Sequence, residues 1–548
     1  MPDCELTGRG AEHIDWDVIV VGAGMGGGML GQRLARAGRR LLFVEKGRST
    51  LPGTADTIRS AMPEIAEPHL SRSKTTYYDA LARSGRSTDE ITDISGRRPR
   101  TFVPFIGAGP GGSSALYGMV CERFFADDFT PRQFFTNPGE STVPESWPIT
   151  YEQLAPWYTQ AEKLLGVRGQ PDPLRPKSGA NLPAAPPFSP DNQPLVNYLS
   201  GRGLHPYHLP MACDYADDCL TCQAYLCPKG CKNDGGRAGV LPAVTEYGAS
   251  LLDECRVVRL DAGQTRVQHI ICQRGNDMLA LRAKVVVLAA GALATPVLLL
   301  NSRSGDWPRG LANGSDMVGR NLMRHVMDWI EIWPQRGSRI TAENKEIGLN
   351  DFYTIDGQKY GTVQSASSMA SLAPVDMMMN QPGLMAKALR WASPVARPVY
   401  DRVISGGLVL AAIMEDLPYR DNRVLPSDRP STDGRQRLRI QYRLHPGELA
   451  RREVFLSALN DVLRPFRTLT LRTGENNGTL GHACGTVRFG ADPATSVLDA
   501  HNRAHELENL YVADASFFPS SSGINPSLTV AANALRVAEH INEAHFAS

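Results

Sequence analysis

The clearest pattern along the chain is an apolar run that ends in a cluster of glycines. Residues 17–21 are apolar and rich in β-branched side chains, and five glycines fall within residues 22–28. Residues 29–37 then have helical periodicity, and residues 40–44 form a second apolar run. This order predicts a strand, a tight turn, a helix and a neighbouring strand.

The glycines predict a phosphate-binding cradle at that turn. Gly22 permits the tight turn, Gly24 lets the backbone approach a pyrophosphate, and Gly27 lets helix and strand pack closely. The helix N-terminus would supply amide donors. Glu45 ends the second run, about 20 residues beyond the glycines, where an acidic side chain can hold a ribose hydroxyl. The motif predicts a dinucleotide but does not separate FAD from NAD.

The chain length and the remaining sequence patterns limit the possible architectures. The 548 residues exceed the size of one hydrophobic core, so about two domains are expected. Residues 147–162 and 528–541 have helical patterns, residues 257–260 are strand-like, and residues 169–194 are proline-rich and predict an extended connection. The longest apolar run, 285–300, is interrupted and shorter than the roughly 18 residues of a spanning helix.

The charge balance and the first residues of the chain limit which partners and which cellular compartment are expected. The 58 Lys and Arg residues nearly balance 57 Asp and Glu residues, so no electrostatic case exists for nucleic acid or an anionic membrane. Small neutral substrates fit this balance. The first ten residues lack the basic start and apolar run of a secretory signal, so we expect a cytoplasmic protein without a membrane span.

Four separated motifs together resemble the glucose-methanol-choline (GMC) oxidoreductase family. They are Gly22-Ala-Gly-Met-Gly-Gly, Gly107-Ala-Gly-Pro-Gly-Gly-Ser-Ser, Val285-Val-Val-Leu-Ala-Ala-Gly, and the C-terminal pair Gly481-His-Ala-Cys-Gly with Ser522-Gly-Ile-Asn-Pro-Ser. The resemblance implies FAD rather than NAD. It also implies an α/β fold, α+β overall, in which a Rossmann-like FAD-binding domain accompanies a discontinuous substrate domain built on an antiparallel sheet with helices.

The resemblance also implies domain boundaries. We assign residues 14–60, 96–130, 196–325 and 481–548 to the FAD-binding domain, and residues 61–95, 131–195 and 326–480 to the substrate-binding and cap regions.

The resemblance places the catalytic chemistry at His482 and Asn525. Alcohol oxidation by a flavin needs a base for the hydroxyl proton, and His is suited because its ordinary pKa lies near neutrality. His482 is the expected base, and Asn525 the amide that orients the substrate oxygen. Without the family resemblance, His482 would be interpreted as a hydrogen-bonded core histidine, and Asn525 would be interpreted as a turn residue because it precedes Pro526. His325 resembles a family segment near the active site and is interpreted as structural or pocket-lining.

The predicted cofactor-binding residues come from all of these motifs. They are Gly22, Gly24, Gly27, Glu45, Gly112, Ser113, Val257, Gly291, Asp514, Ala515, Asn525 and Pro526. Family members with covalent flavin commonly carry a His in the segment that corresponds to residues 111–117. This chain has none there, so we expect non-covalent FAD.

Five of the ten cysteines lie within residues 213–231. Without a secretion signal, such clustering favours metal or redox roles. Cys219, Cys222, Cys227 and Cys231 could supply thiolates to zinc or to an iron-sulfur cluster. Some bacterial sugar dehydrogenases of the family carry such a cluster, but their spacing differs. A structural thiol or disulfide loop is therefore an equal alternative.

These observations predict FAD-dependent oxidation of an alcohol to a carbonyl, by an oxidase or a dehydrogenase. Dioxygen, a quinone or an electron-carrier protein could reoxidise the flavin. Two alternatives stay open: a flavin-containing lyase of the same architecture with no net redox, and an iron-sulfur-linked electron-transferring dehydrogenase subunit. The alcohol and the oligomeric state do not follow from the sequence.

Overall fold

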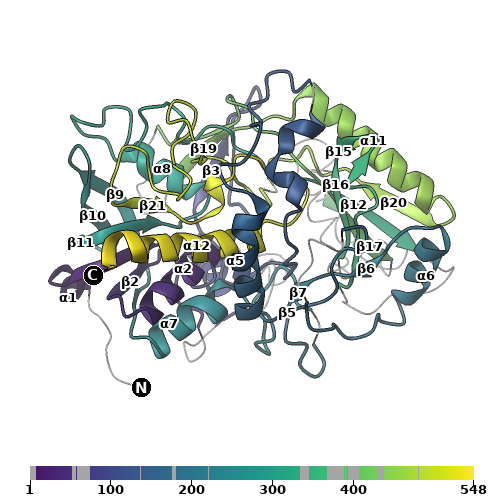
Figure 1. Ribbon diagram of the computed structural model, residues 1–548, viewed down its shortest axis with the longest axis horizontal. Coiled ribbons are helices and arrows are strands. Elements are labelled where there is room, and N and C mark those ends of the chain that lie inside the picture. The colour runs from purple at the N-terminus through teal and green to yellow at the C-terminus, as the bar shows by residue number, and fades with distance from the viewer. Residues whose placement is uncertain are drawn as a thin grey trace.

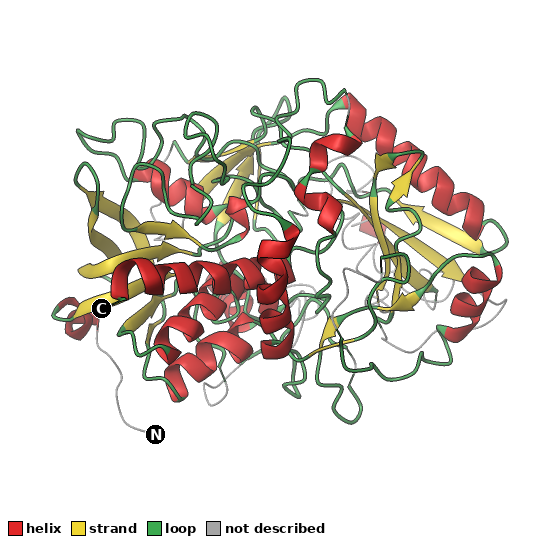
Figure 2. Cartoon of the chain, viewed as in Figure 1, coloured by secondary structure: helices red, strands yellow, loops and turns green. Residues whose placement is uncertain are grey.

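The computed structural model describes residues 8–51, 57–58, 74–135, 137–175, 181–219, 221–333, 345–366, 388, 391–392, 407–428, 437–478 and 480–547. Two sheets lie at opposite ends of an elongated molecule, with the helix α5 (Tyr151–Leu164) between them (Figure 1). Helices lie in front of and below the sheet at the left end and along the outer edge of the sheet at the right end (Figure 2).

The first sheet is the dinucleotide-type sheet that the opening pattern predicts. Its strands run in the order β8 (Ser250–Leu252), β2 (Leu41–Val44), β1 (Asp15–Val21), β11 (Asp277–Leu288), β10 (Val267–Arg274) and β9 (Cys255–Ala262), and β21 (Leu510–Val512) also pairs with β11. The neighbours β8, β2, β1, β11 and β21 are parallel, whereas β9 and β10 join antiparallel. Continuous apolar runs suit strands that are buried on both faces.

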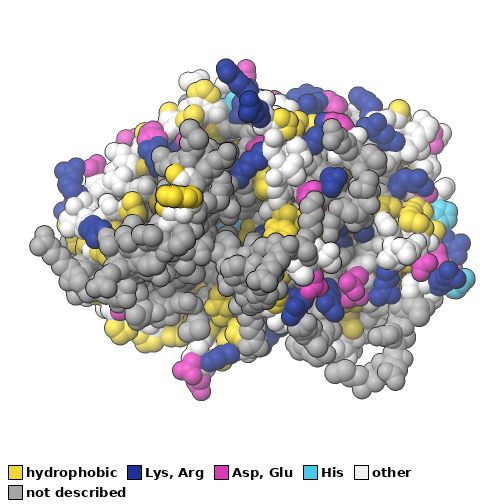
Figure 3. Space-filling view, turned by 180° about the vertical axis from the view of Figure 1, so that it is seen from behind, with side chains coloured by type: hydrophobic (Ala, Val, Ile, Leu, Met, Phe, Trp, Pro, Cys, Tyr) yellow, Lys and Arg dark blue, Asp and Glu magenta, His cyan; other side chains and the backbone are white. Residues whose placement is uncertain are grey.

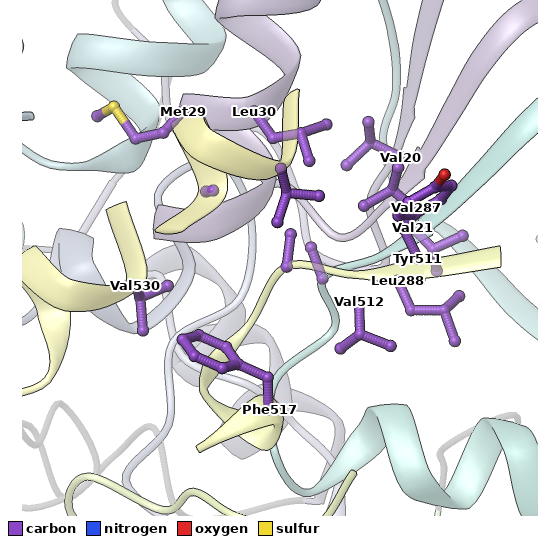
Figure 4. Packing of buried hydrophobic residues seen from close by; sticks show 14 of the residues in the cluster. Val20, Val21, Met29, Leu30, Val287, Leu288, Tyr511, Val512, Phe517 and Val530 are labelled. Atoms are coloured by element: carbon purple, nitrogen blue, oxygen red, sulfur yellow. The ribbon is translucent and has the colours of Figure 1, made fainter. Parts of the chain in front are cut away.

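Helices from distant parts of the chain pack on this sheet. They include α2 (Met25–Arg36), α12 (Ser527–Phe546), α7 (Leu241–Thr245) and α8 (Ala294–Asn301). Figure 4 shows how strands and helices share one core, built from Val20, Val21, Met29, Leu30, Val287, Leu288, Tyr511, Val512, Phe517 and Val530. This shared core explains why segments from both chain ends form one unit.

The second sheet is antiparallel throughout. Its order is β20 (Arg467–Leu471), β12 (Val326–Trp333), β17 (Leu408–Met414), β16 (Gly361–Ala366), β13 (Ile347–Leu349) and β6 (Tyr207–His208). The helices α11 (Pro446–Leu463) and α6 (Gln193–Gly201) pack on one face. The other face carries a small apolar cluster that includes Met327, Trp329 and Ile413. The predicted fold class is confirmed.

Smaller elements complete the fold. A four-stranded sheet contains β18 (Arg423–Pro426), β19 (Arg437–Gln441), β3 (Glu90–Asp93) and β4 (Arg100–Phe102), and two-stranded sheets pair β14 (Thr354–Ile355) with β15 (Gln358–Lys359) and β5 (Val167–Arg168) with β7 (Met211–Ala212). Two short α-helices, α1 (Gly8–Glu12) and α4 (Lys74–Arg83), lie before β1 and β3. The helix α6 packs on the second sheet and β6 is one of its strands. The domain boundaries expected from the sequence place residues 196–325, and with them β6 and most of α6, in the FAD-binding domain.

Acidic and basic side chains are interspersed over the described part of the face in Figure 3, in agreement with a net charge of +1. Among the described helices, none combines the length and apolarity needed to cross a bilayer.

Candidate active site

The predicted phosphate cradle forms where two glycine segments meet. Gly24 forms an isolated bridge with Gly111, and the Cβ of a residue at position 112 would lie 3.1 Å from the Gly24 Cα. At Gly27, a Cβ would lie 2.1 Å from the Gly22 carbonyl oxygen and 3.1 Å from a Val20 methyl group. Glycine is therefore required for α2 to approach β1 this closely.

The residues of the cradle fit a pyrophosphate. Gly24 is the N-cap of the 12-residue helix α2, and no described side chain caps that terminus. A Cβ at Gly24 would have only the Gly111 carbonyl oxygen nearby, at 3.9 Å. First-turn amides that no described side chain caps, together with this open space, suit an anion, which the helix dipole also favours.

Glu45 lies next to the cradle and joins its parts. Its carboxylate accepts hydrogen bonds from the backbone N–H groups of Ala23 at 2.8 Å, Gly47 at 2.8 Å and Gly109 at 3.1 Å. A cavity of about 620 Å³ lies beside this segment, lined in part by Lys46, Gly47, Ala108, Glu254 and Arg256. Val257 is not among its lining residues and instead packs against the first core.

Asp514 joins two of the predicted motifs. One carboxylate oxygen accepts from the Gly291 N–H at 2.9 Å and from the Thr295 hydroxyl at 2.6 Å, and the other accepts from the Ser516 N–H at 2.9 Å. The neighbouring Ala515 carbonyl oxygen accepts from the Gly485 N–H at 3.1 Å. The loop that carries His482 is thereby tied to the end of the first sheet.

His482 and Asn525 meet although 43 residues separate them. The Asn525 Nδ2 lies 3.5 Å from the His482 Nε2. Asn525 immediately precedes Pro526, the N-cap of α12, and is buried, whereas His482 is partly exposed. His482 has a left-handed backbone, with φ at +63°, a conformation that non-glycine residues adopt at a cost and often at functional sites.

A second histidine contacts the first. Met323 and Cys484 exchange backbone hydrogen bonds of 3.0 and 2.9 Å, which brings His325, two residues after Met323, beside His482. The two Nδ1 atoms lie 2.8 Å apart. Burial lowers the pKa of His325 to about 4. Burial, followed by electrostatic repulsion from Lys345 and from His325 when that ring is protonated, also holds the pKa of His482 well below its usual range.

Lys345 is a buried cation near this pair. Its Nζ lies 3.3 Å from the Gln223 Oε1, and a Cβ at Gly118 would lie 2.8 Å from either atom. Burial lowers the pKa of Lys345 to about 8, so the side chain is largely charged at neutral pH. Lys345 therefore adds positive potential at His482.

A buried ion cluster, defined here as Asp128, Lys359 and Glu415, supports the loop before Asn525. All three side chains are 0% exposed, and the Lys359 Nζ lies 2.5 Å from an Asp128 oxygen and 2.8 Å from a Glu415 oxygen. Both carboxylates also hold Ser522, whose hydroxyl donates to Asp128 at 2.9 Å and whose N–H donates to Glu415 at 3.1 Å.

The cysteine loop packs against the predicted flavin segment. The Cys213 and Cys219 sulfurs lie 3.6 Å apart and those of Cys227 and Cys231 lie 4.0 Å apart. The following Lys232 donates to the Ala115 carbonyl oxygen at 3.1 Å. Over the described ranges, no three or more His, Cys, Asp or Glu residues, the predicted Cys219, Cys222, Cys227 and Cys231 included, form a group suited to a metal ion.

The sequence motifs singled out His482 and Asn525 but not the residues that contact or influence them. His325 carried a signal, its family-like segment, yet its contact with His482 spans 157 residues. Gln364, whose Nε2 donates to the Asn525 Oδ1 at 2.6 Å, and Lys345 lie in segments without a motif.

A mostly parallel sheet with a glycine cradle, beside a paired histidine and amide, is typical of a dinucleotide-dependent oxidoreductase. Two family models, both described as GMC oxidoreductase, match residues 17–327 and 418–534. The chain belongs to the GMC oxidoreductase family. Proteins of this family bind FAD, and the similar proteins that the comparisons found are oxidases and dehydrogenases.

Similar proteins include several alcohol-oxidising enzymes. The chain is 28% identical to the 6'''-hydroxyparomomycin C oxidase of Streptomyces lividus, over 96% of this chain and 91% of that protein. It is 26% identical to the 2-methyl-1,2-propanediol dehydrogenase of Mycolicibacterium austroafricanum, over 96% and 95%. The crystal structure of pyridoxine 4-oxidase from Mesorbium loti has a TM-score of 0.64 at 21% identity, over 96% and 99%. That last likeness concerns the fold.

Proposed function

We propose that this protein oxidises an alcohol to a carbonyl compound with non-covalent FAD, using His482 as the base and Asn525 as the group that orients the substrate oxygen. The observation that carries the proposal is the approach of the Asn525 Nδ2 and the His482 Nε2 to 3.5 Å, in a chain that also builds a dinucleotide cradle.

The chemistry divides between these side chains and the cofactor. FAD, when bound, supplies the two-electron acceptor for the carbon centre. The His482 Nε2 takes the hydroxyl proton, which a neutral imidazole can do and an imidazolium cannot. The low pKa of His482 keeps it neutral and ready at physiological pH. The Asn525 amide donates to the substrate oxygen and holds it facing that nitrogen.

Two features bear on the substrate. Gly481 lies beside the apolar face of the second sheet, because a Cβ there would be 4.0 Å from the Met327 Cε. Lys345 places a positive charge near His482. A neutral substrate with an apolar carbon skeleton next to the hydroxyl fits this environment, because Lys345 would repel a cationic one. Dioxygen, a quinone or a carrier protein as the acceptor, and the cytoplasm as the compartment, stay predictions.

The test is anaerobic mixing of the holoenzyme with alcohols, followed through the flavin absorbance. The panel contains 6'''-hydroxyparomomycin C, 2-methyl-1,2-propanediol, pyridoxine and straight-chain primary alcohols. At least one alcohol should bleach the flavin, and His482→Gln should slow bleaching by about 10²–10⁴-fold with unchanged flavin content. His501→Gln, at an exposed histidine, is the matched control and should behave as the unmodified enzyme.

Two results would contradict the proposal. Equal bleaching rates in His482→Gln and the unmodified enzyme would remove His482 as the base. A flavin that stays oxidised while a hydroxynitrile is cleaved would instead establish the lyase alternative, because that reaction involves no net electron transfer.

A further inference from the structure

The contacts around His482 form a chain of hydrogen bonds, the His325 relay, defined as the Ser522 carbonyl oxygen, His325, His482, Asn525 and Gln364. The relay begins in the loop before α12 and ends on β16. Each member has a limited capacity to donate or accept, so the positions of the protons follow from the geometry.

The proton on His325 is fixed at Nε2. This atom lies 2.9 Å from the Ser522 carbonyl oxygen and 3.3 Å from that of Ser521. Carbonyl oxygens only accept, so the His325 Nε2 carries a hydrogen. With a pKa of about 4, His325 is neutral at pH 7 and has one N–H group. Its Nδ1 is therefore an unprotonated acceptor.

The proton on His482 is then fixed at Nδ1. The His482 Nδ1 lies 2.8 Å from the bare His325 Nδ1, so it must be the donor. A neutral His482 consequently has its lone pair on Nε2, the atom that the proposed reaction needs as a base. With the other tautomer, the His482 Nε2 would present a hydrogen and could not accept a proton.

The position of the proton on His482 also determines the orientation of the Asn525 amide. A bare His482 Nε2 faces an N–H donor favourably, which is the Nδ2 of Asn525 at 3.5 Å. Gln364 maintains this orientation by donating to the opposite atom, the Asn525 Oδ1, at 2.6 Å. His482 and Asn525 would contact the substrate oxygen, and each is oriented by a neighbour, His325 or Gln364, that would not contact it.

We propose that His325 is a positioning residue that sets the tautomer of His482, and that Gln364 sets the orientation of the Asn525 amide. This inference rests on the proposed function of His482. When the base takes up the substrate proton, its Nδ1–H continues to donate to His325, which stabilises the imidazolium through a charge-assisted hydrogen bond.

Two substitutions separate this role from a structural one. The amide atoms of Asn lie two bonds from Cβ, as Nδ1 does in His, so His325→Asn retains an acceptor for His482 and loses the donor to Ser522. The amide of Gln lies three bonds from Cβ, as Nε2 does, so His325→Gln retains the donor to Ser522 and loses the acceptor. Both should bind FAD, and circular dichroism verifies that both fold.

The measurements are the rate of anaerobic flavin reduction and the ¹⁵N NMR spectrum of holoenzyme labelled in its histidine rings, with His482 assigned by comparison with His482→Gln. We expect a protonated Nδ1 and a bare Nε2 at His482 in the unmodified enzyme and in His325→Asn. Reduction should slow by less than about tenfold in His325→Asn and by about 10²-fold or more in His325→Gln, within the range of a general-base contribution.

A His482 protonated at Nε2 in the unmodified enzyme would overturn the inference. So would His325→Gln reducing its flavin as fast as His325→Asn or faster, because that order indicates a role in holding Ser522. The NMR result requires no substrate. The tautomer can therefore be established even if His482→Gln retains full activity, an outcome that would contradict the proposed function alone.

Discussion

Replacement of Lys359 by Met should destabilise the protein strongly, because Lys359 neutralises the buried ion cluster. The cluster holds one cation between two carboxylates, and all three side chains are fully buried. Burial opposes the charged form of Lys359, but Asp128 and Glu415 outweigh this effect and raise its pKa. In Lys359→Met, the two buried carboxylates would lose the cation that contacts both of them.

The magnitude follows from which hydrogen bonds survive. Asp128 keeps three donors, from the Tyr353 hydroxyl, the Phe125 N–H and the Ser522 hydroxyl, at 2.6 to 2.9 Å. Glu415 keeps the Ser522 N–H on one oxygen, but its other oxygen loses the ion pair with Lys359. Removing one partner of a buried ion pair costs about 3–5 kcal/mol, so we expect a loss of that size in the free energy of unfolding.

The loss should depend on pH. Burial raises the pKa of Glu415, and Lys359 opposes this rise more strongly than Arg451 does, so removal of Lys359 raises the pKa of Glu415 further. A carboxyl whose folded pKa exceeds its unfolded value of about 4.3 stabilises the fold at low pH and loses that contribution as pH rises through the folded pKa. Lys359→Met should therefore be closer to the unmodified protein at pH 5.5 than at pH 8.

The assay is urea unfolding of the holoenzyme at both pH values, followed by tryptophan fluorescence. The control is Arg266→Met, which breaks an exposed ion pair with Glu508 and should cost less than about 1 kcal/mol. The double variant Lys359→Met/Glu415→Gln should recover part of the stability. A Lys359→Met loss below about 1 kcal/mol at pH 8, or one that is equal at both pH values, would refute the reasoning.

Two further predictions concern the active site. Lys345→Met removes a positive charge that lowers the pKa of His482, so the acidic limb of the pH profile for flavin reduction should move to higher pH. The control is Lys229→Met, on the exposed part of the cysteine loop, which should leave that limb in place. Acid precipitation of the holoenzyme should release all of its flavin into the supernatant; flavin that stays with the polypeptide would contradict non-covalent binding.

The parts of the fold that the sequence predicts are those with local patterns. The run before Gly22, the glycine turn and α2 are adjacent in sequence, and each follows from residue types alone. The helix that begins after Pro526 likewise has a clear period. The family-like segments were enough to select His482 and Asn525, which the structure brings together.

The supports of the site had no such pattern. Gln364 lies on β16, where all six residues are buried, so the strand lacks the alternation that reveals a half-buried strand. His325 belongs to a recognisable segment, but its role depends on backbone pairing between Met323 and Cys484, which no local pattern encodes. Its interpretation as a structural or pocket-lining residue misses the hydrogen bond to His482.

The relay also shows why the two sheets must act together. The His482 loop is tied to the first sheet through the Gly485 N–H and the Ala515 carbonyl oxygen, whereas Gln364 comes from the second sheet. His325 lies directly before β12 of that second sheet and is held by Ser522, which the buried ion cluster fixes. The proton positions at His482 and Asn525 therefore depend on contacts from both sheets.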